Sequence, residues 1–199
     1  MPSLVGSEMC IRDRLMQATD RSTNESNSRT SAYEALASVV ANSATDCLAQ
    51  VSTVLVHMVE RQEALNGMVS QLVGLDDRNN WAELQSNLCS VIIAAVRRLQ
   101  AGMAPIGDRL MTSLLMLIQN SGKQPTVLED AFVAVGTVIV ALEADFEKYL
   151  DAFLPFLVEG LRNHEEHQLC TISVGIVGDV CRSLGAVSYT HLRAHETRH

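Results

Sequence analysis

The chain has 199 residues, of which 47% are hydrophobic and only 4% aromatic, with 11 Gly and 4 Pro. A chain rich in aliphatic residues and poor in helix breakers favours helices over a β-sandwich. The net charge of −8 argues against a nucleic-acid partner, because phosphate binding needs clustered Lys and Arg. No apolar run reaches the length of about 18 residues that suggests a membrane span, so we expect no membrane partner either.

The two ends of the chain differ in texture from the sequence between them. Residues 1–14 contain SLVGSEMCIRDR and residues 186–199 contain VSYTHLRAHETRH, and both stretches resemble translated sequencing-adapter tags. We therefore interpret both segments as non-native and exclude them from the fold prediction. His191, His195 and His199 stand four residues apart, a spacing that could suggest a metal site, but they fall within the second tag.

Helical periodicity begins after a polar segment, residues 15–30, which we predict to be a linker. From there, apolar residues recur at three- and four-residue steps in successive stretches. We predict helices over 31–44, 47–66, 81–99, 105–120, 126–142, 146–162 and 166–184.

The stretch from Thr126 to Leu184 is the most informative part of the chain. Helix 126–142 is apolar almost all round, including Val140, so every side of it must be covered. Helix 146–162 has one broad apolar stripe and a polar opposite side, and helix 166–184 is again mostly apolar. A buried, a half-exposed and another buried helix in succession predict a stacked array of helical hairpins.

The predicted helices also recur at a regular interval. The first helices of the pairs begin near Ser31, Trp81, Thr126 and Glu166, at intervals of roughly 50, 45 and 40 residues, a period typical of HEAT or armadillo repeats. We therefore predict an all-α fold, a HEAT-repeat α-solenoid of about three and a half helix pairs. The pairs cover residues 31–66, 81–120 and 126–163, and the half repeat covers residues 166–185.

No pattern of catalytic or cofactor-binding residues stands out. Gly122-Lys123 lacks the rest of a phosphate-binding loop, and His164 and His167 are three residues apart, whereas the zinc-protease motif needs four. None of the five cysteines forms a CxxC pair, so we expect reduced, buried or half-buried thiols. Trp81 is interpreted as a packing residue. We predict no enzyme activity, no catalytic residue, no cofactor and no metal.

Acidic residues recur on the polar faces of the second helices of the pairs. Ordinary solvation of each carboxylate is one interpretation. The other follows from the array, in which second helices stack side by side on one surface. Acids there would combine into a negative trough that attracts a basic segment. On that interpretation we predict four partner-binding residues: Glu60, Asp108, Asp151 and Glu159.

Several longer stretches resemble the importin-β (karyopherin-β) family of nuclear import receptors. They are AYEALASVVANSATDCLAQV, LQSNLCSVIIAAVRRLQ, LEDAFVAVGTVIVALEADFEKYLDAFLPFLVEGLRN and VGIVGDVCRSLG. The combination of the leucine-rich LQSNLC, the FEKYLDAFLPFL stretch and VGIVGDVCR is specific in order and spacing. The resemblance spans nearly all of residues 15–185 and indicates an internal part of such a receptor.

The resemblance implies a superhelix of HEAT repeats that catalyses nothing. It implies binding of the basic importin-α N-terminal segment or a basic cargo, release on binding of GTP-bound Ran, and contact with phenylalanine-glycine nucleoporins. It also implies a location in the cytoplasm and nucleus, including the nuclear pore. The alternative is a HEAT-repeat scaffold or adaptor subunit of another complex, which differs in that a basic peptide and a GTP-bound GTPase would not compete for it.

Overall fold

The computed structural model describes residues 11, 13–19, 26–122, 124–163 and 165–185. Within these ranges the secondary structure is helical, without a strand. The chain divides into two compact units, Met1–Leu99 and Gln100–His199. Both predicted tags, with the three histidines of the second, lie outside the described ranges apart from residues 11, 13 and 14.

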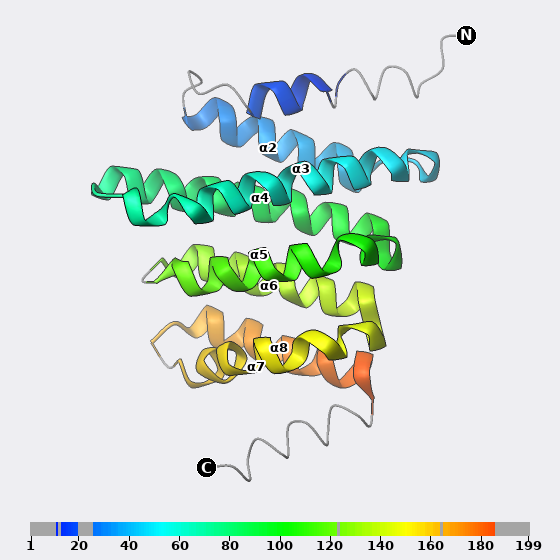
Figure 1. Ribbon diagram of the computed structural model, residues 1–199, viewed down its shortest axis with the longest axis vertical. Helices are drawn as coiled ribbons and strands as arrows, with labels where there is room; N and C mark the ends of the chain where they lie inside the picture. The colour runs from blue at the N-terminus through cyan, green and yellow to red at the C-terminus, as the bar shows by residue number, and fades with distance from the viewer. Residues whose placement is uncertain (1–10, 12, 20–25, 123, 164, 186–199) are drawn as a thin grey trace. The chain divides into compact units, whose positions relative to one another are not determined.

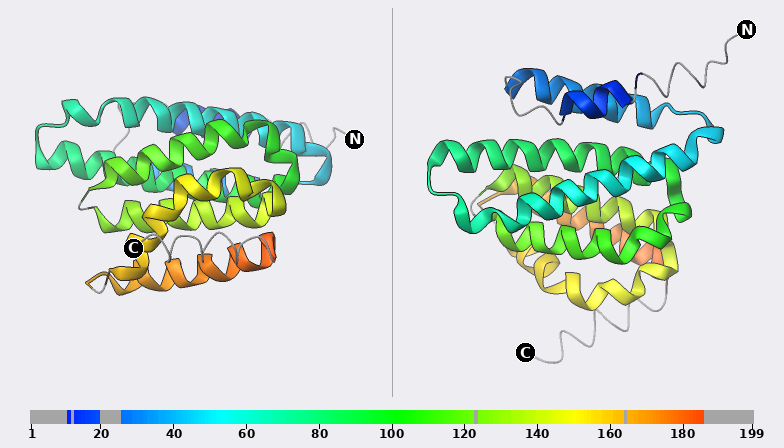
Figure 2. Two further views of the ribbon diagram at one scale, coloured as in Figure 1. Left: turned by 60° about the horizontal axis from the view of Figure 1, so that its bottom comes forward. Right: turned by 45° about the horizontal axis from the view of Figure 1, so that its top comes forward.

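The first unit contains three long helices. α2 spans Ser26–Ala41, α3 spans Leu48–Gly67 and α4 spans Leu75–Leu99, with short 3-10 helices at Thr45–Cys47 and Val69–Gln71. α4 packs against both α2 and α3, and Figures 1 and 2 show α2 and α4 side by side. The core consists of fully buried aliphatic side chains that include Leu36, Leu55, Met58, Leu88 and Ile92.

Four α-helices lie in the described part of the second unit. α5 spans Gly107–Ser121, α6 spans Pro125–Leu142, α7 spans Glu147–Arg162 and α8 spans His167–Leu184. Short 3-10 helices at Gln100–Ile106 and Glu143–Phe146 precede α5 and α7. α6 packs against α5 on one side and α8 on another, while α7 contacts α5 and α8.

α6 is the most deeply buried of these helices, as its composition predicts. Its buried residues include Phe132, Val135 and Val138, each at most 1% exposed. Pro125 stands at the first turn, where its fixed backbone angle suits a helix start and no amide hydrogen is needed. The prediction that α6 is covered on every side is wrong at Val140, which is 49% exposed, because the helices of this unit leave one strip of α6 open.

The α-helices follow one another in the predicted order along the chain. Their grouping into three pairs, α2–α3, α4–α5 and α6–α7, with α8 as the half repeat, stays a prediction. The largest difference is the start of α4, which lies at Leu75 and not near Trp81. Asp76 and Asp77 occupy its first turn, and an Asp77 carboxylate oxygen accepts from the Gly74 amide at 3.2 Å. Acids in a first turn stabilise a helix, so the polar segment extends α4.

The polar segment 15–30, predicted as a linker, is helical over residues 13–19 and from Ser26 onward. The buried Thr19 hydroxyl accepts from Arg61 Nη1 of α3 at 2.5 Å, and the same nitrogen lies 3.3 Å from the Tyr33 hydroxyl of α2. A polar sequence therefore joins the packed structure here because its hydroxyl groups have partners.

Trp81 is a packing residue, as predicted. It is buried, and its indole nitrogen donates to the Leu65 carbonyl oxygen at 3.1 Å, which ties α4 to the end of α3. The predicted thiol burial holds for Cys47 and Cys89, and Cys170 is half-buried, but Cys181 is exposed. Cys181 lies on the side of α8 that no described helix covers.

One feature bears on the expected lack of a membrane partner. Among the described residues, the helical stretch Leu75–Ser121 is long and apolar enough to cross a membrane. The helical segments Ser28–Ala41 and Thr45–Gln71, which are bent relative to each other, are long and apolar enough only when they are counted together as one span. Core helices of globular proteins meet the same criterion. The absence of a membrane partner therefore stays a prediction.

Candidate partner-binding surface

The predicted binding residues lie on the second helices of the pairs. Glu60 lies on α3, Asp108 on α5, and Asp151 and Glu159 on α7, and all four are exposed. α5 and α7 contact each other within the second unit, so the structure brings the latter three residues onto neighbouring helices. Glu60 belongs to the first unit, and its prediction as part of the same trough stays untested.

Asp108 is held in a small polar cluster. One carboxylate oxygen accepts from Lys148 Nζ and from the Tyr149 hydroxyl, both at 2.6 Å. The Lys148 ammonium also lies 4.8 Å from the centre of the Tyr149 ring, within range of a cation–π contact. Asp108 is therefore neutralised locally by a base of the same chain, which weakens the prediction that it attracts a basic partner.

The cluster shifts the protonation equilibria of its members. The hydrogen bond from Lys148, followed by that from Tyr149, lowers the pKa of Asp108. The same bond to Asp108 is the main cause that raises the pKa of Lys148. Burial of the ring, with the bond to Asp108 as the second cause, raises the pKa of Tyr149. All three shifts favour a carboxylate that faces an ammonium group and a neutral phenol.

α7 carries three exposed acidic residues of the second unit. Glu147, Asp151 and Glu159 are all exposed, and their spacing of four and eight residues places them on one broad side of the helix. We call these three residues the α7 acidic surface. Leu150, Phe153, Leu154 and Leu157 on the opposite side are buried and fix the orientation of the helix.

Two further acids precede this surface. Like Glu147, they were not among the binding residues predicted from the sequence. Glu143 and Asp145 are exposed in the 3-10 helix that leads into α7. The signal was present in the run LEADFEKYLD, in which four acids stand within nine residues. The spacing of apolar residues, taken alone, assigned the first part of that run to a join between helices and the rest to an amphipathic helix.

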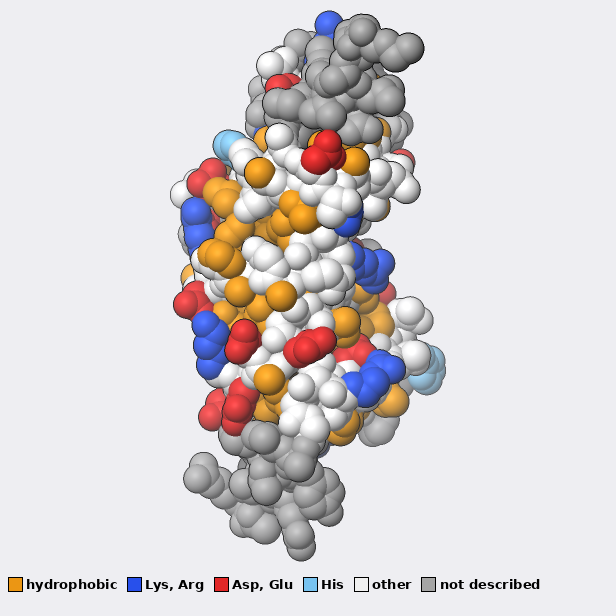
Figure 3. All heavy atoms as spheres, turned by 90° about the vertical axis from the view of Figure 1, so that its right-hand side faces the viewer, with side chains coloured by type: hydrophobic (Ala, Val, Ile, Leu, Met, Phe, Trp, Pro, Cys, Tyr) orange, Lys and Arg blue, Asp and Glu red, His pale blue; other side chains and the backbone are white. Residues whose placement is uncertain are grey.

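Bases are interspersed with these acids. Arg162 occupies the last turn of α7, three residues beyond Glu159. Figure 3 shows a face of the molecule on which acidic side chains lie beside Lys and Arg side chains. The α7 acidic surface therefore has bases close to it on the same helix, Lys148 and Arg162, and a partner would need its own bases opposite the acids. Glu60 has a comparable neighbour, since its carboxylate lies 3.5 Å from His57 Nδ1.

The lowered pKa of Asp108 can be tested directly. A carboxyl group whose pKa is lowered by folding adds stability above its unfolded pKa, and that stability is lost as the pH falls through the folded value. We expect an NMR titration of the Asp108 carboxyl group to give a pKa below the ordinary aspartate value. In Lys148→Met the value should rise toward the ordinary one.

Arg162→Met serves as the control for this titration, because Arg162 lies at the other end of α7. It should leave the Asp108 titration unchanged. An ordinary pKa for Asp108 in the unmodified chain would show that the Lys148 and Tyr149 contacts do not persist in solution.

Successive α-helices joined by short segments, with the deeply buried α6 packed between α5 and α8, define a helical-repeat protein. The sequence model of the family described as importin subunit beta-1-like, TPR repeats, matches residues 8–194. Importin subunit beta-1 of Schizosaccharomyces pombe is 41% identical over 172 residues, which are 86% of this chain and 20% of that protein. Its counterpart in Arabidopsis thaliana is 34% identical over 181 residues, 87% of this chain and 20% of that protein. The chain belongs to the importin subunit beta-1 family and spans about a fifth of the length of these relatives.

Solved structures agree in fold. A crystal structure of importin beta, obtained in an ammonium sulfate condition, matches with a TM-score of 0.92 at 34% identity, covering 96% of this chain and 22% of that one. A structure of Kap95p with RanGDP matches with a TM-score of 0.82 at 25% identity, covering 98% of this chain and 22% of that one. The predicted all-α solenoid of HEAT repeats is confirmed. Kap95 in complex with Nup1 shares the fold at 24% identity, with a TM-score of 0.82 over 96% of this chain and 22% of that one.

Proposed function

We propose that the chain is a segment of a karyopherin-type nuclear transport receptor that binds basic protein segments. The observation that carries the proposal is the family match over residues 8–194, with 41% identity to a curated importin subunit beta-1. A receptor of this class binds and releases partners and catalyses no reaction. It works in the cytoplasm and nucleus, including the nuclear pore.

The α7 acidic surface supplies the attraction in this proposal. The proposed ligand is the basic N-terminal segment of importin-α or a basic segment of a cargo. Such segments are disordered when free and are ordered on binding, so part of the interaction energy is spent on ordering them. Exposed carboxylates act over about 8 Å at physiological ionic strength, so the attraction should weaken steeply with salt.

Release follows from linkage. In this proposal, GTP-bound Ran favours a differently curved state of the helical array. A ligand that prefers one state lowers the affinity for a ligand that prefers the other state. A matched structure of Kap95p with RanGDP, whose switch loops adopt the GTP-bound conformation, supports Ran as a partner of the family. Kap95 with Nup1 likewise supports a nucleoporin partner, for which phenylalanine-glycine segments are the proposed ligands.

Charge reversal on α7 tests the electrostatic part of the proposal. We expect the double variant Asp151→Lys/Glu159→Lys to bind a labelled basic importin-α peptide about tenfold more weakly at low salt, because reversed charges repel the peptide. The difference should shrink toward zero as salt is raised. Fluorescence anisotropy of the peptide measures both effects.

The matched control reverses two exposed acids in the first unit, Glu34→Lys/Asp46→Lys. It changes the net charge by the same amount and should leave the affinity nearly unchanged. Equal affinities of the α7 variant and the unmodified chain at low salt would exclude the α7 acidic surface as the binding surface. Equal losses in both double variants would show a non-specific charge effect.

A further inference from the structure

The bond between Asp108 and Lys148 lies at the surface of the second unit, within the proposed binding region. The Asp108 side chain is 79% exposed and that of Lys148 is 57% exposed, and their charged atoms lie 2.6 Å apart. An exposed ion pair adds little net stability, because water solvates both charges well once they separate. A competing charged group can therefore replace either partner at low cost.

Lys148 comes from within the α7 acidic surface itself. It follows Glu147 directly and stands three residues before Asp151, so it shares a side of α7 with Asp151. Its ammonium group reaches across to α5 and donates to the Asp108 carboxylate. A lysine of a basic segment would bring the same chemical group to this acid. Lys148 thus occupies a position that a basic ligand would otherwise take.

Tyr149, the other partner of Asp108, is held more firmly than Lys148. Its ring packs against that of the fully buried Phe146, with the ring centres 5.6 Å apart. Its hydroxyl lies so close to α5 that a β-carbon on Gly107 would be only 3.0 Å away. Tyr149 therefore keeps the Asp108 carboxylate oriented, while Lys148, on a long flexible stem, can swing away from it.

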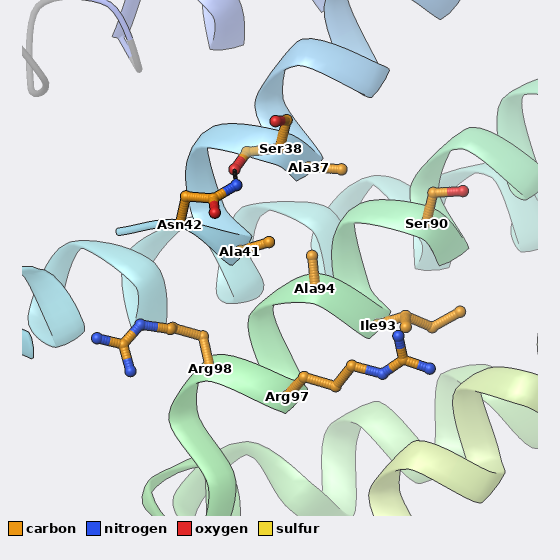
Figure 4. A pocket seen from close by; sticks show the side chains of 9 residues that line it. All are labelled: Ala37, Ser38, Ala41, Asn42, Ser90, Ile93, Ala94, Arg97 and Arg98. Atoms are coloured by element: carbon orange, nitrogen blue, oxygen red, sulfur yellow. Dashed lines mark hydrogen bonds between the residues drawn. The ribbon is translucent and has the colours of Figure 1, made fainter. Parts of the chain in front are cut away.

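Two arginines of the first unit show that a base can bridge helical elements without occupying an acid. An Arg29 amino group of α2 donates to the Asn80 side-chain oxygen of α4 at 2.8 Å. Arg98, labelled at the end of α4 in Figure 4, donates from Nε to the Ser43 carbonyl oxygen beyond α2 at 2.8 Å. Both acceptors are neutral. The Lys148 bridge differs, since its acceptor is a carboxylate on the surface proposed to bind basic segments.

We propose that Lys148 is an internal competitor that must leave Asp108 before a basic segment can bind there. The inference rests on the proposed function, and it adds a residue that regulates the same surface. In the free chain Lys148 neutralises Asp108, so weakly basic segments gain little from this acid. An arginine of the ligand displaces Lys148, because a planar guanidinium group can bond both carboxylate oxygens, whereas Lys148 bonds one. Asp108 then joins Asp151 in holding the ligand.

A double-mutant cycle on the whole chain tests this competition. The probe is a fluorescein-labelled arginine-rich peptide, whose binding is measured by anisotropy at low salt. We expect Lys148→Met to bind the peptide about fivefold more tightly, because no lysine of the chain then occupies Asp108. Asp108→Asn alone should change the affinity by less than about twofold. In the Lys148→Met background, Asp108→Asn should remove most of the gain.

Arg78→Met is the matched control, since it removes one positive charge from an exposed residue of the first unit. It should strengthen binding by no more than about twofold, and circular dichroism melts of each variant confirm that the fold is retained. The inference alone is overturned if Lys148→Met gives the same gain with and without Asp108→Asn, or if Arg78→Met gives as large a gain. Absence of binding in every variant overturns the proposed function and this inference with it.

Discussion

Replacing Phe153 by alanine is expected to lower the free energy of unfolding by about 3–5 kcal/mol. Phe153 of α7 is fully buried, and its ring meets that of Phe132 of α6 edge-on, with the ring centres 5.5 Å apart. Truncation removes the transfer free energy of a large apolar side chain, leaves a cavity and abolishes the ring contact. Urea denaturation followed by circular dichroism measures the change.

Phe156→Ala provides the comparison on the same helix. Phe156 is only half-buried, so its removal exposes less apolar surface and leaves no closed cavity. We expect a clearly smaller loss of stability than for Phe153→Ala. Equal losses at the two positions would contradict the orientation of α7 that places Asp151 and Glu159 at the surface.

Gly160→Ala is expected to destabilise the chain by about 1–3 kcal/mol, although alanine is the better helix former. A β-carbon at Gly160 would collide with the Ser173 hydroxyl of α8 and lie 3.0 Å from Phe132 Cε1 of α6. Ser173 cannot turn aside at no cost, because its hydroxyl is buried and donates to the Leu169 carbonyl oxygen at 2.8 Å. Glycine here permits the close approach of α7 to two neighbouring helices.

Gly175→Ala is the matched control within α8. A β-carbon at Gly175 meets nothing within 4 Å, so the variant should gain up to about 1 kcal/mol from helix propensity. Adding Ser173→Ala to Gly160→Ala should restore part of the loss, because the hydroxyl is the nearest obstacle. A Gly160→Ala variant as stable as the unmodified chain would contradict the packing of α7 against α8.

The helices were predictable from the sequence because their apolar residues keep a regular spacing. Leu150, Phe153, Leu154 and Leu157 are buried where periodicity placed them. The start of α4 was not predictable in this way, since Leu75 to Asn80 carry almost no apolar signal and are helical through their acidic first turn. The spacing of apolar residues identifies the buried side of a helix. The first turn of α4 is exposed, so it has no such spacing.

The candidate surface was only partly predictable, for a different reason. The sequence identifies the exposed acids of α7, because a polar residue opposite an apolar stripe faces outward. It does not reveal that Lys148 and Tyr149 hold Asp108, since that contact joins residues 40 and 41 positions apart.

A calorimetric titration of the whole chain with the basic N-terminal segment of importin-α would test the proposed receptor function most directly. We predict saturable binding of one segment per chain, with an affinity that falls as the salt concentration rises, because exposed carboxylates supply the attraction. Absence of binding at low salt, or binding whose affinity does not change with salt, would contradict the proposal that the acidic second helices hold a basic segment.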